Sequence, residues 1–140
     1  MEPTFKPDGL VQQSVEGGSP VIHVAMNYRL GFFGFAQSGS LKEEGSENAG
    51  LRDQRLAIEW VRDNIEIFGG DPENITIFGQ SSGGLAIGMH ILAYGGTKPL
   101  PFQKKIELTR LISNVHSIVN PFLFILLFLY KLRNAVRNNI

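Results

Sequence analysis

Two short apolar runs along the chain predict buried strands. Residues 20–27 and 74–78 are rich in β-branched side chains and are bounded by turn-forming residues. The first run is apolar at most positions, which is typical of a strand whose two faces are both covered by helices. We therefore expect both runs to lie in a mostly parallel sheet.

Two further segments predict helices. Residues 51–68 combine charged side chains with apolar ones at helical spacing, and a pair of glycines follows their end. Residues 82–94 predict a second helix, and residues 28–50 predict a loop followed by an exposed connection. We expect the aromatic cluster of this loop, Phe32, Phe33 and Phe35, to pack in the core rather than to line a substrate pocket. The order strand, connection, helix, strand, helix is that of a βαβ unit, so the predicted class is α/β with flanking helices. The apolar positions of the first helix are Leu56, Ala57, Trp60, Val61, Ile65 and Phe68. We expect its charged side chains to form a mostly solvated face with a surface ion pair; these are Arg52, Asp53, Arg55, Glu59, Arg62, Asp63 and Glu66.

Composition excludes some classes of function. Lys and Arg together number 13 and Asp and Glu also number 13, so the chain lacks the basic excess that a nucleic-acid partner requires. The same balance gives no support for binding to an anionic membrane surface. Because there is no cysteine, disulfides, thiolate metal sites and cysteine nucleophiles are excluded. No basic segment followed by an apolar run marks a signal peptide at the N-terminus, and the compartment stays undetermined.

The motif with the clearest chemistry is G-Q-S-S-G at residues 79–83, an instance of G-x-S-x-G. It follows the second predicted strand directly and precedes the second predicted helix. In that context the serine occupies a sharp strand-to-helix turn that exposes its hydroxyl, and we expect the two glycines to keep side chains out of the crossing. The backbone N–H of Ser82 would point toward a developing oxyanion. The alternative is a glycine-rich turn in which Ser81 serves only as an N-cap.

Three blocks of sequence carry a resemblance to a known family. They are V-A-M-N-Y-R-L-G-F-F-G-F at residues 24–35, the ungapped block at residues 48–84 that contains the serine motif, and A-Y-G-G-T-K-P-L-P-F-Q at residues 93–103. Through these blocks, the stretch from about Asp8 to Gln103 resembles the type-B carboxylesterase/lipase family, and within it the fungal members.

The resemblance implies an α/β-hydrolase fold and hydrolysis of small-molecule carboxylic esters through an acyl-enzyme, with no cofactor and no metal. It implies a triad of serine, acid and histidine, in which Ser81 matches the nucleophile. Ser82 matches the residue whose backbone N–H lines the oxyanion hole. The family often has Glu where Gln80 stands, so a charge beside the nucleophile is missing here. It often has Ala at the position of Ser82, a change that leaves the backbone donor in place.

The rest of the catalytic machinery is not evident. The fold places its triad histidine after the serine in the chain. His23 precedes Ser81, and His90 follows it on the same predicted helix at about 13 Å along the axis, which is out of reach. His116 lies where the resemblance has ended. The glycine-rich stretch that completes the family's oxyanion hole is also absent, because the glycines at residues 17–18 form an ordinary turn. We therefore expect a catalytically incomplete fragment.

The alternatives to an esterase fragment come from other classes. The family includes non-catalytic adhesion members, so a binding protein of the same fold is one alternative, although the retention of Ser81 favours the enzyme lineage. A small membrane-associated protein using residues 121–130 is another. That apolar run has ten residues, and a membrane span needs about 20, so we expect no membrane insertion. Full-length relatives in the family are often secreted.

The end of the chain differs in character from the rest. We predict a partial α/β-hydrolase domain at residues 1–103 and a divergent apolar tail at residues 104–140. Foreign sequence introduced by a frame change or a retained intron is the interpretation that we favour for the tail. A membrane anchor and a buried helix are the other two. Since a sheet with so few strands exposes strand edges and apolar faces, we expect the isolated chain to fold poorly.

Overall fold

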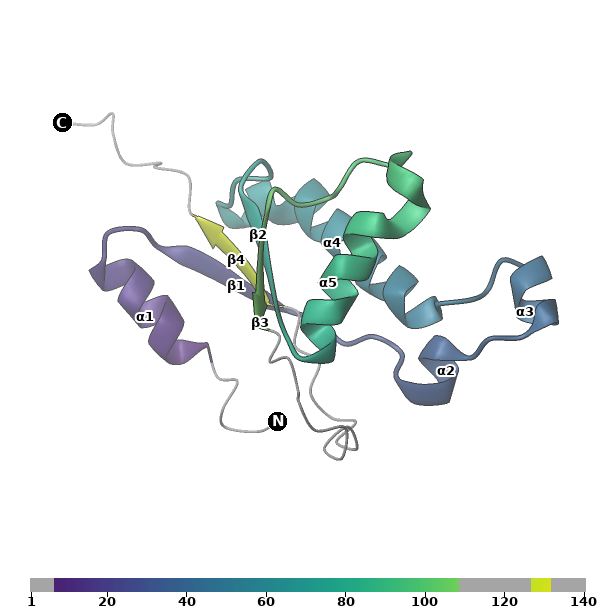
Figure 1. Cartoon of the computed structure of the whole chain (residues 1–140). Coiled ribbons are helices and arrows are strands. Elements are labelled where there is room, and N and C mark those ends of the chain that lie inside the picture. The colour runs from purple at the N-terminus through teal and green to yellow at the C-terminus, as the bar shows by residue number, and fades with distance from the viewer. Residues whose placement is uncertain (1–6, 109–126, 132–140) are drawn as a thin grey trace.

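The structure is a computed structural model that describes residues 7–108 and 127–131. In this part of the chain, helices surround a small mixed sheet (Figure 1). The helices are α1 (Asp8–Glu16), α2 (Gly31–Phe35), α3 (Gly39–Glu43), α4 (Ala49–Asn64) and α5 (Ser82–Leu92), with 3₁₀ turns η2 (Ile65–Phe68) and η3 (Ala93–Gly96). The strands are β1 (Val21–Ala25), β2 (Ile75–Gln80), β3 (Lys104–Leu108) and β4 (Leu127–Lys131). The predicted α/β class is confirmed.

The four described strands lie in the order β1-β4-β2-β3. β2 and β3 pair in parallel, with Thr76 opposite Lys104. β4 is antiparallel to both β1 and β2, so β1 and β2 run in the same direction without touching each other. The described parts of the predicted tail are thus strands of this sheet and not a helix. The domain boundary near residue 103 stays a prediction.

The core lies between the sheet and the pair α4 and α5. Ile75 and Ile77 alternate along β2 and are fully buried, as are Ile58 of α4 and Ile87 of α5. Side chains two residues apart on a strand share one face, which explains why these two isoleucines meet the same helices. α1 contacts β1 and lies across the sheet from α4 and α5 (Figure 1).

The buried face of α4 agrees with the predicted one only in part, because Val61 and Ile65 are buried as expected but other predicted positions are exposed. The residues that face the core are Gln54, Ile58, Val61 and, in the following turn, Ile65. Leu56, Trp60 and Phe68, expected at apolar helical positions, are 68%, 55% and 60% exposed. α4 therefore carries apolar side chains on two faces, and within the described residues only one of them is covered.

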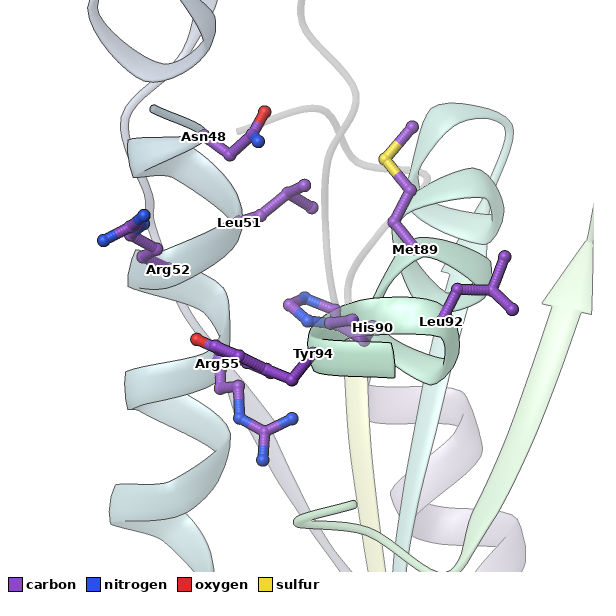
Figure 2. Close-up of a pocket in the computed structure, with 9 residues that line it drawn as sticks. Asn48, Leu51, Arg52, Arg55, Met89, His90, Leu92 and Tyr94 are labelled. Atoms are coloured by element: carbon purple, nitrogen blue, oxygen red, sulfur yellow. The ribbon is translucent and has the colours of Figure 1, made fainter. Parts of the chain in front are cut away.

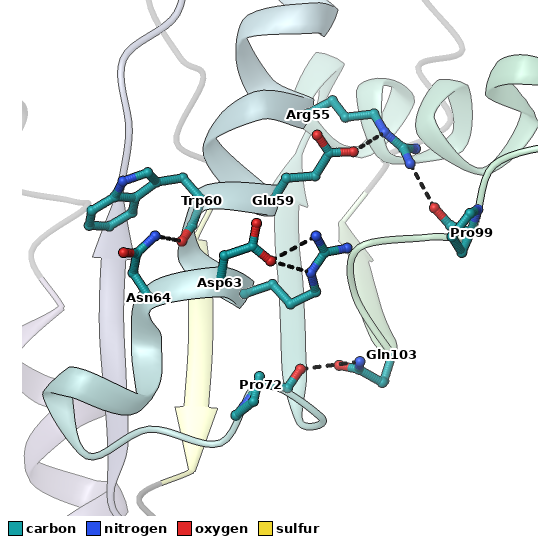
Figure 3. A network of polar contacts seen from close by, with 9 residues as sticks. Arg55, Glu59, Trp60, Asp63, Asn64, Pro72, Pro99 and Gln103 are labelled. Atoms are coloured by element: carbon teal, nitrogen blue, oxygen red, sulfur yellow. Dashed lines mark hydrogen bonds and ion pairs between the residues drawn. The ribbon is translucent and has the colours of Figure 1, made fainter.

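A charged residue of α4 is buried, whereas we expected a solvated charged face. Arg55 is only 6% exposed; its Nε donates to Oε1 of Glu59 at 2.8 Å and its Nη2 donates to the carbonyl of Pro99 at 2.6 Å (Figure 3). The exposed pair Arg62 and Asp63 follows the expectation. Arg55 thus ties α4 to the segment that leads into β3.

The connection between β1 and α4 contains two short helices and not the predicted loop. α2 approaches α4 closely, because a Cβ on Gly50 would lie 2.7 Å from the ring of Phe35. Phe32 and Phe33 meet edge to face at 6.1 Å between ring centroids, but they are 79% and 84% exposed. The expectation that this aromatic cluster packs in the core is therefore wrong for these two residues.

Two substitutions on α4 test which of its faces is buried. Ile58→Ala should lower the free energy of unfolding by about 2–5 kcal/mol, because it removes buried methyl and methylene groups and leaves a cavity. Leu56→Ala, two residues away on the exposed face, should change it by less than about 0.5 kcal/mol. Denaturant unfolding of both variants and the parent chain measures the difference. Equal destabilisation by the two substitutions would mean that the core lies on another face of α4.

Candidate active site

The serine motif lies at a turn from β2 directly into α5. β2 ends at Gln80, α5 begins at Ser82, and Ser81 stands alone between them with φ 55° and ψ −123°. A positive φ is uncommon for a residue with a Cβ, and a conformation of this kind costs about 1–3 kcal/mol. The predicted strand–turn–helix geometry is therefore present, and the chain pays for it in backbone strain at the serine.

The hydroxyl of Ser81 is not used to cap the helix. Ser81 stands at the N-cap position of α5, yet its side chain makes no capping hydrogen bond, and the residue is exposed. N-cap serines ordinarily have extended backbone angles and accept a hydrogen bond from the first turn of the helix. The geometry of Ser81 differs on both counts, which argues against a purely structural capping role.

Close packing of the helix start against the strand end makes one glycine of the motif essential. A Cβ on Gly79 would lie 2.5 Å from the carbonyl carbon and oxygen of Gly83 and 2.8 Å from the nitrogen of Gly84. A Cβ on Gly83 would meet no atom within 4 Å. We expected that both glycines of the motif would be needed to let the strand and the helix approach each other. Of these two described glycines, only Gly79 lies where a side chain would clash.

The N-terminus of α5 provides backbone donors next to the serine. The hydrogen bonds of the helix start with the N–H of Leu85, which donates to the carbonyl of Ser81 at 3.2 Å. The N–H of Ser82 precedes that series, and such N–H groups have no acceptor within their own helix. The positive end of the helix dipole adds a favourable potential for an anion. This environment is compatible with the oxyanion role of Ser82, which stays a prediction.

His90 is part of a buried polar network behind the site. It is 3% exposed, and its Nε2 lies 2.9 Å from Oε1 of Gln54, an oxygen that can only accept. Burial, with the charge of Arg55 as a smaller cause, lowers the pKa of His90 to about 4. Gln54 also hydrogen-bonds to Tyr28, whose pKa is raised above its ordinary value by burial. His90 is thus neutral near pH 7 and engaged in holding α5 to α4.

Neither described histidine can serve Ser81 as a base. His90 lies near the opposite end of α5, as expected. In the register of the sheet, His23 is opposite Leu129 of β4, and Leu129 is in turn opposite Thr76 of β2. His23 is therefore level with Thr76, which precedes Ser81 by five residues along the chain. At about 3.3 Å per residue that offset is about 16 Å. His116 lies outside the described residues.

The cavity between α4 and α5 is separate from the serine. It has a volume of about 420 Å³, and Figure 2 shows its lining residues, which come from the start of α4 and the end of α5. Ser81 stands at the other end of α5, a helix of 11 residues and therefore about 16 Å long. The lining residues are Asn48, Leu51, Arg52, Arg55, Met89, His90, Leu92, Ala93 and Tyr94.

No metal centre accompanies the serine in the described part of the chain, where no group of three or more His, Asp or Glu side chains could hold an ion. The described residues also contain no helix that is both long enough and apolar enough to cross a membrane. The candidate site therefore consists of Ser81, the start of α5 and the packing beneath them.

Sequence comparison identifies the class of protein. The chain belongs to the carboxylesterase family, whose model matches residues 2–108. This match confirms the resemblance drawn from the three sequence blocks, and the family implies the α/β-hydrolase fold.

The individual relatives are fungal proteins. A secreted lipase of Arthroderma benhamiae, ARB07186/07185, is 64% identical over 105 residues, which are 75% of this chain and 19% of that protein. Lipase 5 of Diutina rugosa is 54% identical over 92 residues, 66% of this chain and 17% of that lipase. The inactive carboxylesterase-like protein VdtD of Byssochlamys spectabilis is 48% identical over 103 residues, 74% of this chain and 17% of that protein. The chain thus spans less than a fifth of the length of these relatives.

The buried network behind the site is not among the features predicted from the sequence, although a signal for it exists. Gln54 precedes Ile58, Val61 and Ile65 at spacings of four, three and four residues. A polar residue in register with such an apolar stripe is expected to be buried and hydrogen-bonded. The partner, His90, could not be assigned because it is remote in the sequence.

Two glycine substitutions test whether the close contact between β2 and α5 at Gly79 matters for stability, with a glycine inside α5 as the control. Gly79→Ala should lower the free energy of unfolding by about 1–3 kcal/mol, because its Cβ overlaps the backbone of Gly83. Gly88→Ala, inside α5 with open space around its Cβ, should be neutral or stabilising by up to about 1 kcal/mol. Thermal or denaturant unfolding measures both. A Gly79→Ala chain as stable as the Gly88→Ala chain would contradict the close crossing.

Acid should destabilise the fold through His90. Its pKa in the folded chain, about 4, is below the ordinary value of 6.5, so the unfolded state binds the proton more readily. The contribution to stability is complete above pH 6.5 and is lost progressively as the pH falls toward 4. Unfolding free energies measured between pH 7 and 4 should therefore fall less steeply in His90→Gln. NMR titration of the ring checks the premise, and a midpoint near 6.5 would contradict it.

Proposed function

We propose that this chain is the nucleophile-bearing segment of a carboxylic-ester hydrolase, with Ser81 as the nucleophile. The observation that carries the proposal is the backbone of Ser81, at φ 55° and ψ −123° between β2 and α5. Its residue is exposed and its hydroxyl makes no capping hydrogen bond. A serine on a sharp strand-to-helix turn presents its oxygen to a bound ester.

The proposed chemistry follows from that placement. The oxygen of Ser81 attacks the ester carbonyl, and a base takes the hydroxyl proton as the new C–O bond forms. The N–H of Ser82 donates to the resulting oxyanion. Collapse of the tetrahedral intermediate breaks the ester bond, the alcohol leaves with the proton from the base, and water then hydrolyses the acyl-enzyme. The substrate is a small-molecule carboxylic ester; no cofactor and no nucleic acid takes part.

We also propose that the chain does not assemble a catalytic triad by itself. His90 is buried against Gln54 and His23 is level with Thr76, so neither lies beside the serine. A serine hydroxyl without a base is a weak nucleophile. The relatives are more than five times as long as the matched segment. The base and the acid are accordingly expected from parts of a family domain that these described residues do not provide.

A chimera tests the function of the segment. Residues 8–103 replace the aligned segment of the Arthroderma benhamiae lipase, and hydrolysis of a chromogenic ester is measured. The chimera should be active, and Ser81→Ala within it should lower kcat by about 10⁴-fold or more. Ser82→Ala is the matched control and should retain activity within about tenfold, because its proposed donor is a backbone N–H. Full activity of the Ser81→Ala chimera would exclude the proposed nucleophile.

The 140-residue chain alone tests the second proposal. A fluorophosphonate probe modifies only an activated serine, so it should not label this chain while it labels the chimera. Labelling of the chain that disappears in Ser81→Ala would mean that a working base is present, and the chain would then be catalytically complete.

A non-catalytic binding protein of the same fold is the second candidate. The similarity to a protein of Byssochlamys spectabilis named an inactive carboxylesterase-like protein favours it. The two candidates differ in the chimera, since a folded chimera without ester hydrolysis would support the binding protein. A membrane-associated protein has less support. Of the apolar run at residues 121–130, residues 121–126 lie outside the described part of the chain, and the remainder begins strand β4.

A further inference from the structure

One of the four described strands lies outside the residues that match the carboxylesterase family. β1, β2 and β3 lie within residues 2–108, which match the carboxylesterase family, and all three run in the same direction. β4 (Leu127–Lys131) lies outside that match and is antiparallel to its neighbours. The strand that breaks the parallel arrangement is therefore the one that lies beyond the family match. β3 also falls in the predicted tail at residues 104–140, but it lies within the match and pairs in parallel.

β4 makes all the pairing between β1 and β2. It pairs along Val21–Ala25 on one side and with residues 75–78 on the other. Neighbouring strands are about 4.8 Å apart, so β1 and β2 are separated by about 10 Å, too far for a backbone hydrogen bond. The family-derived strands thus leave a gap one strand wide, bordered on both sides by backbone N–H and C=O groups.

Helices lie on both sides of the sheet that contains the gap. α1 lies on one side of the sheet and α4 with α5 on the other (Figure 1). An occupant covered on both faces should be apolar along its whole length and not alternating. The first three residues of β4, Leu-Phe-Leu, have this character, and Tyr130 and Lys131 add polar groups at the end of the strand.

We propose that the gap between β1 and β2 is a strand-acceptor site and that residues 127–131 fill it in cis. The tail then acts as an internal substitute strand that allows a short piece of a much larger fold to close its sheet. Recognition comes from main-chain pairing on both edges and from an apolar, extended segment. Because β2 ends at Gln80, the residue before Ser81, filling the gap holds the strand that leads to the serine between two neighbours, β3 and β4.

Disulfide crosslinking in the full chain tests the proposal, because the chain has no cysteine of its own. Leu129 is opposite His23 on β1 and opposite Thr76 on β2. Opposed residues of antiparallel strands have Cα atoms about 4.5–5.5 Å apart, within the range that a disulfide spans. The double variants His23→Cys/Leu129→Cys and Thr76→Cys/Leu129→Cys should both form an intramolecular disulfide on mild oxidation, detected by non-reducing electrophoresis and peptide mapping.

The matched control is Val24→Cys/Leu129→Cys. Successive residues of a strand point to opposite faces, so this pair should crosslink at least tenfold more slowly. Registered pairs that crosslink no faster than the control would overturn the proposal. Disulfide-linked dimers in place of intramolecular bonds would also overturn it, since a second copy would then supply the strand.

Hydrogen exchange on the full chain gives an independent measurement. Leu129→Pro removes a ladder N–H and disfavours a central strand. It should abolish amide protection in both β1 and the β4-facing edge of β2, while an exposed-site variant such as Leu56→Ala retains it. Unchanged protection in both strands would contradict the proposal. If Leu129→Pro unfolds the whole chain, the crosslinking pairs still decide.

Discussion

The close contact between the end of β2 and the start of α5 is the constraint on which the rest of the structure depends. The backbone of Gly83 and Gly84 lies against Gly79, so the chain must change from strand to helix within one residue. Ser81 is that residue, and its positive φ is the consequence. A side chain at Gly79 would push the start of α5 away from β2 and allow Ser81 to adopt a backbone conformation with negative φ. The exposed hydroxyl of Ser81 and the glycine at position 79 thus both depend on the close contact between β2 and α5.

Strain at the serine persists because the elements on either side of it are fixed elsewhere. Ile77 of β2 and Ile87 of α5 are buried in the same cluster, and the hydrogen bond between Gln54 and His90 joins α5 to α4. Burial of one isoleucine side chain contributes about 1.5–3 kcal/mol, which is comparable to the strain at one such residue. The packing of β2 and α5 in the core thus stabilises both elements by an amount that can offset the strain at the serine.

The sequence predicts those features whose signals are local, and it fails where the signal is ambiguous or remote. β1, β2 and α5 follow from apolar runs and from the glycines at the serine motif. The buried face of α4 follows only in part. Val61 and Ile65 are buried as predicted, but Leu56 and Trp60 compete with Ile58 as apolar positions. The pairing of residues 127–131 with β1 could not be predicted either, because it joins segments about a hundred residues apart. It also depends on hydrogen bonds between backbone groups, which leave no signal in the pattern of side chains.

The apolar side chains of α5 indicate that this helix is covered by fewer elements than its composition calls for. α5 contains no Asp, Glu, Lys or Arg, and a helix that is apolar all round belongs in a core covered on every side. Leu85 and Leu92 are nonetheless 58% and 79% exposed on it. A nucleophile elbow needs only a strand, a glycine and a helix start, all close in sequence. A proton acceptor for the proposed nucleophile would have to come from another element, because the two described histidines lie away from Ser81.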